Sequence, residues 1–409
     1  MNLAIDFLTL HQPTGAGEYI RRIFYGVLEY ISSHDIKDRN VYALYDSSLG
    51  VYYQDLNLDK IKQMKVAPID VNNYKSVAEA LKLNHIDTFF VGCAQYLGKY
   101  PSLENISCRV ICVIHDLSYE ENYYNNIQPF QVLNYGPFRQ DMIRKPKGWS
   151  LLFNRKSPTM RFIKWYFNNR RNGNWEKDLE RMEKVMDMVR QNPKTEIIAV
   201  SDYTKNSIIF NFGVPSNQIT VLYSPERIFS SEGSATDPQV KDLIETKKKY
   251  YLIVSAGRLE KNAYKAIKAF EKFAVSHQDS YLVTIGFKER CFKNHIDLGF
   301  LSDTDLALCY ANCYAFLYPS FFEGFGYPPI EAMHYSKPVL SSNVCSMPEI
   351  LGSAPIYFSP LYISDIYMAL NNLTDANYNE YSEKSKSQYL AVRSRQEDDL
   401  NIIIKKIIE

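Results

Sequence analysis

The chain has 409 residues, of which 46% are hydrophobic and 23% are charged, and its formal net charge is +1. This composition is ordinary for a protein with a full apolar core and excludes a wholly disordered chain. A net charge near zero gives no overall attraction to nucleic acid, so we expect no nucleic-acid partner. The length favours two domains.

No apolar run of the chain reaches the roughly 20 residues that a membrane-spanning helix needs. The first ten residues, MNLAIDFLTL, carry no basic segment and contain Asp6, so we expect no secretory signal peptide. Seven cysteines without a CxxC pair predict buried thiols in a reducing cytoplasm, and not a zinc site or a disulfide framework.

Short runs rich in β-branched and aromatic residues alternate with stretches of helical periodicity. The expected strands are 3–7, 41–45, 88–91, 110–114, 197–200, 220–223, 251–255, 281–285, 313–317 and 339–341. The expected helices are 17–31, 203–212, 264–277, 303–310 and 330–335. This alternation predicts an α/β fold in which parallel sheets are covered by helices on both faces.

A polar stretch that ends in three lysines, without an apolar run, predicts a linker between two α/β halves. We expect an N-terminal Rossmann-like domain over 1–228, the linker over 229–249 and a C-terminal Rossmann-like domain over 250–385. A helical pattern continues through 386–409, and we expect this C-terminal helix to pack back on the N-terminal domain.

Residues 142–175 differ in composition from the rest of the chain. They hold nine lysines and arginines, no acidic residue, and all three tryptophans. Within them, 159–169 fit a helix with one aromatic and one basic face, which is typical of binding to an anionic membrane surface. An inserted helical subdomain with an aromatic core fits the pattern equally well, and nucleic acid fits it less well.

The stretch YPSFFEGFGYPPIEAMHYSKPVL, residues 318–340, follows an apolar run. Gly324 and Gly326 permit a sharp turn close to a ligand, and the prolines that follow suit the start of a helix. Free backbone N–H groups at a helix start form an anion site. Glu323 and Glu331 have seven residues between them, which suits contact with two separate parts of one long ligand. Glu331 alternatively fits a first-turn charge that only stabilises the helix.

A second motif follows the run YYLIVSAG at 250–257. Arg258 and Lys261 come directly before a helix for which we expect Asn262 as the N-cap. A guanidinium and an ammonium at the end of a strand are suited to holding a diphosphate. A solvated Arg and Lys in an ordinary loop is the alternative.

Two candidate groups lie in the N-terminal half. His115 follows a strand, where ligands of open α/β sheets bind, and is placed to donate to a substrate hydroxyl or to act as an acid or base. A histidine bonded to a loop for structural reasons is the alternative. Gly15 and Gly17 form a tight turn before a helix, which suits contact with a phosphate. Ile20 occupies the third glycine position of the dinucleotide fingerprint, which counts against a nicotinamide oxidoreductase.

Asp303 and Asp305 have the spacing of paired carboxylates in many metal-dependent nucleotide-sugar enzymes. Ser302 precedes them, and the helical pattern continues after them. We therefore expect Ser302 as N-cap, the two carboxylates in the first helical turn and no metal.

Taken together, these motifs resemble those of family 4 glycosyltransferases, the retaining group 1 enzymes of GT-B fold. The block 320–360 carries the resemblance most specifically, because it is similar to the family's pattern Ser-x-x-Glu-Gly-Phe-Gly-x-Pro-x-x-Glu-Ala-Met and the segments after it. The segments 298–306, 114–118 and 199–205 are also similar to family segments. The resemblance covers about two thirds of the chain.

The resemblance implies two Rossmann-like domains that face a cleft, with the acceptor bound by the N-terminal domain and the donor by the C-terminal domain. It implies transfer of a hexose from GDP-mannose or a UDP-hexose to a glycan or lipid-linked oligosaccharide, without a cofactor or metal. We expect a cytoplasmic protein, peripheral on the inner face of the cell membrane, in surface polysaccharide assembly. The alternative is a catalytically silent GT-B subunit that binds a partner or a glycan.

The resemblance also implies a role for each polar motif residue. Arg258 and Lys261 would bind the donor diphosphate and stabilise the departing nucleoside diphosphate. Glu331 would bind the ribose and Glu323 hydroxyls of the transferred sugar. His115 would contact the sugar near the reacting carbon. Loss of one such charge-stabilising donor typically costs about 3–4 kcal/mol of the activation free energy.

Backbone groups complete the implied donor site. The turn before the helix would contact the sugar and the phosphates, through Gly324, Phe325, Gly326 and Tyr327. Gly15 and Gly17 would line the cleft from the opposite domain. The family has two more residues between its arginine and lysine than the present Arg-Leu-Glu-Lys, so Lys265 is a second candidate for the lysine of the diphosphate clamp.

Overall fold

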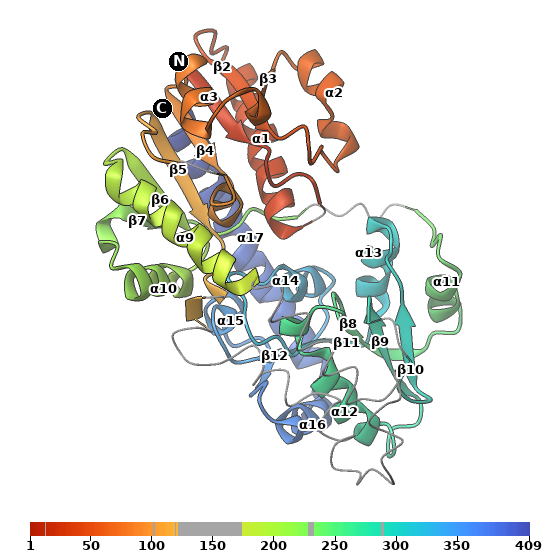
Figure 1. Ribbon diagram of the computed structural model, residues 1–409. Coiled ribbons are helices and arrows are strands. Elements are labelled where there is room, and N and C mark those ends of the chain that lie inside the picture. Colours follow the sequence, from red (N-terminus) through yellow and green to blue (C-terminus); the bar gives the residue numbers. More distant parts are fainter. Residues whose placement is uncertain (13, 101–102, 119, 122–173, 228–232, 288–289) are drawn as a thin grey trace, which may run out of the picture. The chain divides into compact units, whose positions relative to one another are not determined.

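A computed structural model describes residues 1–12, 14–100, 103–118, 120–121, 174–227, 233–287 and 290–409, apart from the side chains of 174–178 and 259 (Figure 1). The described chain forms two α/β units. Unit 1 comprises Met1–Glu121, Asn174–Arg227 and Arg393–Glu409, and unit 2 contains the described part of Ile228–Val392. Of the basic aromatic segment 142–175, only the last two residues are among those described.

Unit 1 is built around a seven-stranded parallel sheet of order β3-β2-β1-β4-β5-β6-β7. Its strands are β1 (Asn2–Asp6), β2 (Asn40–Tyr45), β3 (Ala67–Asp70), β4 (Thr88–Val91), β5 (Arg109–Ile114), β6 (Thr195–Ala199) and β7 (Ile219–Val221). The central strands are almost entirely buried and apolar, as a parallel sheet covered on both faces requires.

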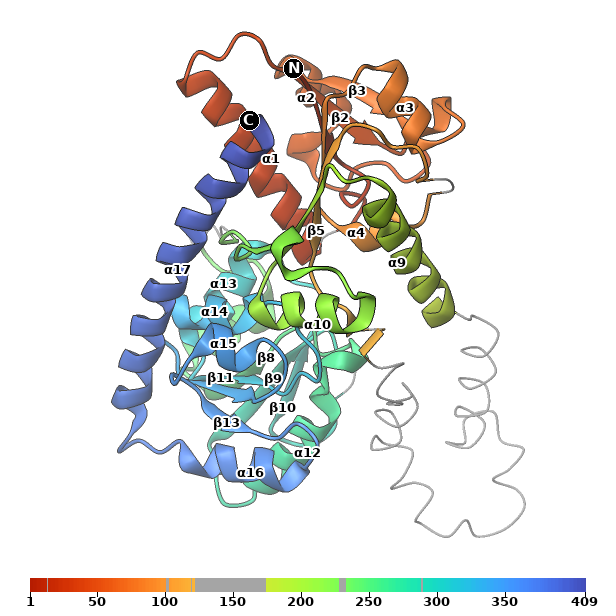
Figure 2. The same ribbon diagram turned by 90° about the vertical axis from the view of Figure 1, so that its left-hand side faces the viewer.

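The helices of unit 1 follow its strands in the α/β order (Figures 1 and 2). They are α1 (Gly15–Ser33), α2 (Leu58–Gln63), α3 (Val77–Leu83), α4 (Ala94–Leu97), α9 (Asn174–Gln191) and α10 (Asp202–Phe212). Thr14 and Ser201 cap α1 and α10, since each hydroxyl accepts a backbone N–H three residues on. Gly213 ends α10 in the left-handed conformation that glycine favours.

Residues 393–408 of the long helix α17 (Tyr378–Ile408) complete unit 1. Ile403 and Ile407 are fully buried there. Arg109 donates to the carbonyl oxygen of Lys406 at 2.7 Å, and the backbone N–H of Tyr223 donates to Asp399 at 2.7 Å. The helix is therefore part of the core of unit 1 and is not a loosely attached tail.

Unit 2 contains a six-stranded parallel sheet of order β10-β9-β8-β11-β12-β13. Its strands are β8 (Lys249–Ile253), β9 (Ser280–Ile285), β10 (His295–Leu298), β11 (Ala315–Tyr318), β12 (Val339–Ser342) and β13 (Ile356–Phe358). Its helices are α11 (Pro238–Glu245), α12 (Ala263–Phe273), α13 (Asp303–Asn312), α14 (Tyr327–His334), α15 (Met347–Leu351), α16 (Ile363–Asn372) and residues 378–392 of α17.

Helices α12 and α16 lie side by side and cover one face of this sheet (Figures 1 and 2). Phe270 of α12 packs against Tyr251 of β8 with ring centroids 5.3 Å apart. Ile366 and Leu370 of α16 are fully buried in the same core. This packing fixes the carboxyl ends of β8 and β11, from which the candidate site is built.

The predicted α/β fold with parallel sheets is confirmed, and each expected strand and helix overlaps an observed one. Three strands were not expected, namely β3, β10 and β13, and each lies at an edge of its sheet. The sequences of β3 and β10 mix polar and apolar residues, and β13 is only three residues long, so none of the three has a long apolar run. The region expected to be a linker contains the helix α11, which begins at the N-cap Asp237 and buries Val240 and Leu243.

All seven cysteines are free thiols, and Cys93, Cys112, Cys309 and Cys313 are buried as expected. The expectation is wrong for Cys108 and Cys345, which are half-buried, and most clearly for the exposed Cys291. It lies in the loop between β9 and β10, where no apolar run surrounds it. Within the described ranges, no helix is both long enough and apolar enough to cross a membrane.

Candidate functional site

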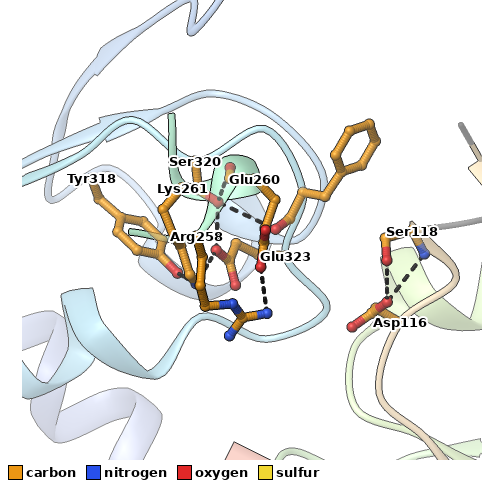
Figure 3. A network of polar contacts seen from close by, with 9 residues as sticks. Asp116, Ser118, Arg258, Glu260, Lys261, Tyr318, Ser320 and Glu323 are labelled. Atoms are coloured by element: carbon orange, nitrogen blue, oxygen red, sulfur yellow. Dashed lines mark hydrogen bonds and ion pairs between the residues drawn. The ribbon is translucent and has the colours of Figure 1, made fainter. Parts of the chain in front are cut away.

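A buried ion pair lies in the loops that follow β8 and β11 (Figure 3). Nζ of Lys261 is 2.6 Å from Oε1 of Glu323 and 3.1 Å from the hydroxyl of Tyr318. The two charged side chains are only 8% and 13% exposed. Because charges this far from water need partners, the pair holds both groups in a defined position.

Ser320 ties the two loops together. Its Oγ lies 2.5 Å from Oε1 of Glu323 and 3.1 Å from the carbonyl oxygen of Glu260. The backbone N–H of Phe321 donates to the same carbonyl oxygen at 2.8 Å. Ser346, after β12, donates to the carbonyl oxygen of Glu323 at 2.9 Å. The backbone and the carboxylate of Glu323 are thus fixed from three directions.

Arg258 is the exposed cation of the site. Its side chain is 67% exposed and forms an ion pair with Glu260, whose side chain is 35% exposed (Figure 3). The preceding Gly257 allows a close approach of two loops, since a Cβ there would lie 2.3 Å from the carbonyl oxygen of Gly286. The sequence therefore presents one open and one buried cation at the end of β8.

Lys265, the alternative lysine of the diphosphate clamp, lies elsewhere. Its Nζ donates to the carbonyl oxygen of Leu361 at 3.0 Å and lies 4.8 Å from the centroid of the Phe321 ring. Burial lowers the pKa of Lys265 to about 8. Lys261, not Lys265, is therefore the lysine that the fold places beside Glu323.

Asn262 occupies the N-cap position of α12, as predicted. Asn262 has a positive φ of 52° and makes no side-chain cap bond to α12. Its side-chain amide instead donates to the carbonyl oxygens of Pro319 and Pro360, at 2.9 and 3.0 Å. An amide has two donors, and here both are used to join the loops after β11 and β13.

The turn before α14 is as tight as the glycines predicted. Gly326 has a φ of 87°, and a Cβ there would lie 2.3 Å from the terminal carbon of Met347. However, the second and third residues of α14 are Pro328 and Pro329, which have no N–H. Among the first four residues of α14, only Tyr327 and Ile330 have a backbone N–H. The expected anion site therefore has two helical N–H donors and not the usual four.

Glu331 is the fifth residue of α14 and not part of its first turn, so the interpretation as a first-turn charge is wrong. The helix starts three residues earlier than predicted, because the two prolines suit its first positions. The carboxylate is buried, and the hydroxyl of Tyr310 on α13 donates to its Oε2 at 2.7 Å.

In unit 1, His115 follows β5 as expected. Its Nε2 lies 2.8 Å from the carbonyl oxygen of Gly92, and its ring meets that of Tyr19 edge to face at 5.0 Å. Burial lowers the pKa of His115, so the neutral ring is favoured and Nε2 carries the proton that Gly92 accepts. In this neutral form Nδ1 is an acceptor. Next to it, Asp116 accepts hydrogen bonds from Ser118 (Figure 3).

The glycine turn of unit 1 is part of a helix cap. The backbone N–H of Gly17 donates to Oγ1 of Thr14 at 3.1 Å. A Cβ at Gly17 would lie 2.8 Å from the hydroxyl of Tyr53, which explains the glycine. Gly15 is exposed at the first position of α1. Of the two glycines, only Gly15 keeps an N–H that the Thr14 cap does not use.

Ser302 is the N-cap of α13, as predicted, and accepts from the backbone N–H of Asp305 at 3.1 Å. Asp305 in turn accepts from the backbone N–H and hydroxyl of Thr236, at 2.8 and 2.5 Å. Among the described residues, no group of three or more His, Cys, Asp or Glu side chains is arranged to hold a metal ion.

Four residues of the site were not among the sequence candidates, namely Tyr310, Tyr318, Ser320 and Glu260. Ser320 precedes Glu323 by three residues, a spacing that could have indicated it. Glu260 lies between the two predicted cations. No local sequence spacing indicates Tyr310 or Tyr318, because their contacts arise from the packing of elements that are separate in the sequence.

Residues 236–358 match the model of the family described as Glycosyl transferases group 1. The serotype-specific mannosyltransferase WbdA of Escherichia coli is 28% identical over 230 residues, which are 52% of this chain and 27% of that protein. The O-antigen chain mannosyltransferase B of Escherichia coli is 28% identical over 204 residues, or 45% of this chain and 53% of that protein. The chain thus spans about a quarter to a half of the length of these relatives.

Solved structures match over the whole chain. HepE of Anabaena in complex with UDP-glucose has a TM-score of 0.61 and 13% identity, covering 100% of this chain and 98% of that one. WaaG, a glycosyltransferase involved in lipopolysaccharide biosynthesis, has a TM-score of 0.58 and 13% identity. The match covers 98% of this chain and 99% of WaaG. The chain has the GT-B fold. The polar network described above lies in the C-terminal unit of this GT-B chain, within the part that also matches the family model.

Proposed function

We propose that the protein is a retaining glycosyltransferase that moves a hexose from a nucleotide sugar to a glycan or lipid-linked oligosaccharide in surface polysaccharide assembly. The match of residues 236–358 to the group 1 family and the GT-B fold support this proposal. The observation that carries it is the pair of cations, Arg258 and Lys261, beside Glu323 at the carboxyl ends of β8 and β11. Open α/β sheets bind ligands at this edge.

Charge explains why these residues suit glycosyl transfer. When the sugar leaves its donor, negative charge develops on the diphosphate, and fixed cations stabilise it. Arg258 offers an exposed guanidinium, and Lys261 a buried ammonium whose position is fixed by Tyr318 and Glu323. We propose that these two cations carry the leaving diphosphate without a metal ion.

The carboxylates are assigned to the neutral parts of the donor. We propose that Glu323 accepts hydrogen bonds from hydroxyls of the transferred sugar, and that Glu331 accepts them from the ribose. Both carboxylates are held by protein donors, Ser320 and Tyr310 respectively, so neither has to be ordered by the ligand. Such preorganisation lowers the entropic cost of binding. We propose that His115 meets the sugar near the reacting carbon through Nδ1.

The relatives favour mannose as the transferred sugar. WbdA, the O-antigen chain mannosyltransferase B and the protein RfbU of Salmonella typhimurium are all named mannosyltransferases. We therefore propose GDP-mannose as the first donor to test. A UDP-hexose is the second, because HepE was solved in complex with UDP-glucose.

We propose further that the enzyme works in the cytoplasm on the inner face of the cell membrane and contacts anionic lipid through 142–175, a segment with nine basic residues and no acidic one. Neutralising Arg161, Lys164, Arg170 and Arg171 together should reduce co-sedimentation with anionic vesicles. Unchanged co-sedimentation would contradict the membrane contact and would leave the proposed catalysis untouched.

The donor site is tested by thermal unfolding of the purified protein with GDP, UDP, ADP or CDP, each in the presence of EDTA. A ligand at about 100 times its dissociation constant adds about 2.7 kcal/mol, a shift of roughly 2–4 °C for domains of this size. One nucleotide should shift the wild type and Glu245→Gln, an exposed control on α11, but not Lys261→Ala. No shift with any nucleotide would favour the silent GT-B subunit over the enzyme.

A further inference from the structure

Each cation of the proposed diphosphate cradle faces a carboxylate of the protein itself. Lys261 faces Glu323, which the proposed function uses for the sugar, whereas Arg258 faces Glu260 (Figure 3). Glu260 lies between the two cations in sequence and belongs to the same short 3-10 turn as Lys261. The proposed function gives Glu260 no ligand group to bind.

The backbone keeps Glu260 at this place. Its carbonyl oxygen accepts from the backbone N–H of Phe321 at 2.8 Å and lies 3.1 Å from Oγ of Ser320. The backbone N–H of the next residue, Lys261, donates to the carbonyl oxygen of Arg258 at 3.1 Å. The turn is therefore closed on both sides, and the Glu260 carboxylate stays within reach of the guanidinium.

A carboxylate at this place interacts with bound phosphates by repulsion and competes with them for Arg258. The repulsion grows with the negative charge of the ligand. A nucleoside diphosphate ends in a phosphate with a single bridging substituent, and its second ionisation, like that of a phosphate monoester, has a pKa near 6. At neutral pH it therefore carries more negative charge than the nucleotide sugar. The same carboxylate thus acts more strongly against the product than against the donor.

We propose that Glu260 is a charge-selective residue of the donor site that weakens binding of the nucleoside diphosphate relative to the nucleotide sugar and so favours release of the product. The proposal rests on the proposed function, because it needs the diphosphate beside Arg258. Glu260 acts through charge alone, and the exposure of its side chain, 35%, lets its carboxylate turn away when a phosphate takes its place at the guanidinium.

The test measures dissociation constants by calorimetry, in EDTA and at low salt, for wild type, Glu260→Gln and Glu245→Gln. The control removes an equivalent charge from a mostly exposed ion pair on α11. The ligands are GDP, GDP-mannose and guanosine, or the uridine series if UDP gives the thermal shift. Glu260→Gln should tighten the diphosphate about two- to five-fold, the range expected for one exposed charge interaction. It should tighten the nucleotide sugar less and leave the nucleoside unchanged.

Further outcomes distinguish a failure of the Glu260 proposal from a failure of the proposed function. Salt at about 1 M should remove most of the difference between Glu260→Gln and wild type, because screening acts on exposed charges. Equal tightening of all three ligands, or none, would overturn the role of Glu260. If wild type and Glu260→Gln both fail to bind any nucleotide, the proposed function fails, whereas binding that depends on Lys261 but not on Glu260 overturns only the present inference.

Discussion

The hydroxyl of Tyr310 donates a 2.7 Å hydrogen bond to Oε2 of Glu331. Tyr310 is fully buried on α13, and Glu331 is buried on α14, so one helix orients the carboxylate of the next. Loss of the donor to a buried carboxylate lowers the unfolding free energy, because water cannot take the place of the donor.

Tyr310→Phe should therefore weaken binding of the donor nucleotide by up to about ten-fold, since a hydrogen bond to a charged group contributes about 1.5 kcal/mol or more. Tyr250→Phe is the matched control, because the hydroxyl of Tyr250 is equally buried and donates to the carbonyl oxygen of Cys309 at 2.8 Å. Tyr310→Phe should lose about 1.5 kcal/mol or more of unfolding free energy and Tyr250→Phe about 1 kcal/mol, but only Tyr310→Phe should lose nucleotide affinity by calorimetry. Equal affinity in both would contradict the role given to Glu331.

The Lys261–Glu323 pair should show strong coupling in a double-mutant cycle. Lys261→Met or Glu323→Gln alone leaves one charge buried without its partner, which typically costs about 3–5 kcal/mol of unfolding free energy. The double variant should cost clearly less than the sum of the two. Urea unfolding measures all three variants.

The exposed pair Lys384–Glu380, at 2.6 Å on α17, serves as the control for this cycle. Its single variants should each cost less than about 1 kcal/mol, because water screens the pair. If the site pair were additive within about 0.5 kcal/mol, the two residues would not act as one buried unit.

Gly326→Ala should destabilise unit 2 by more than backbone strain alone explains. A non-glycine residue in the left-handed region costs about 1–2 kcal/mol, and the contact with Met347 adds an overpacking cost of about 1–3 kcal/mol. Gly50→Ala has a similar φ of 72° with no atom within 4 Å of the added Cβ, and isolates the strain. Met347→Ala should partly rescue Gly326→Ala in thermal unfolding, and a complete lack of rescue would refute the steric part.

The stability of unit 1 should depend on pH through Asp6, at the end of β1. Burial raises the pKa of this carboxyl to about 7, although the backbone N–H of Leu8 donates to it at 2.7 Å. Between about pH 4 and 7 the folded chain therefore holds a proton that the unfolded chain has released. The resulting stabilisation is complete below about pH 4 and is lost as the pH rises through about 7.

Asp6→Asn does not titrate, so the difference in unfolding free energy between wild type and this variant should change by up to about 4 kcal/mol from acid to neutral pH. Wild type should lose stability relative to the variant as the pH rises. Urea unfolding at several pH values between 4 and 8 measures the difference. A difference that is constant with pH would show that Asp6 is ionised in the folded chain throughout this range.

The sequence predicted the architecture well where burial is complete. Val110–Ile114 and Thr88–Val91 are short apolar runs rich in β-branched and aromatic residues, as expected of strands in a sheet covered on both faces. His295–Leu298 forms an edge strand with two polar side chains, and its pairing with β9 depends on a partner that the local sequence does not reveal.

The site was predictable in its residue types and less so in its geometry. Arg258 and Lys261 follow β8 and Glu323 follows the neighbouring β11, so the strand order brings Lys261 to within 2.6 Å of Glu323. Local sequence does not show that Asn262 would use its amide to join two loops, because the acceptors, Pro319 and Pro360, lie in the loops after β11 and β13, far along the chain. It also does not show that Tyr310 would orient Glu331.

The last segment of α17 has a consequence for folding during synthesis. Unit 1 needs residues 393–408 for its core, and these leave the ribosome only after all of unit 2 has been made. Until then the apolar surface that covers Ile403 and Ile407 stays open, and Arg109 lacks the backbone acceptor that it finds at Lys406. Unit 2 needs no residue after 392. Unit 1, which is synthesised first, therefore completes its fold after unit 2.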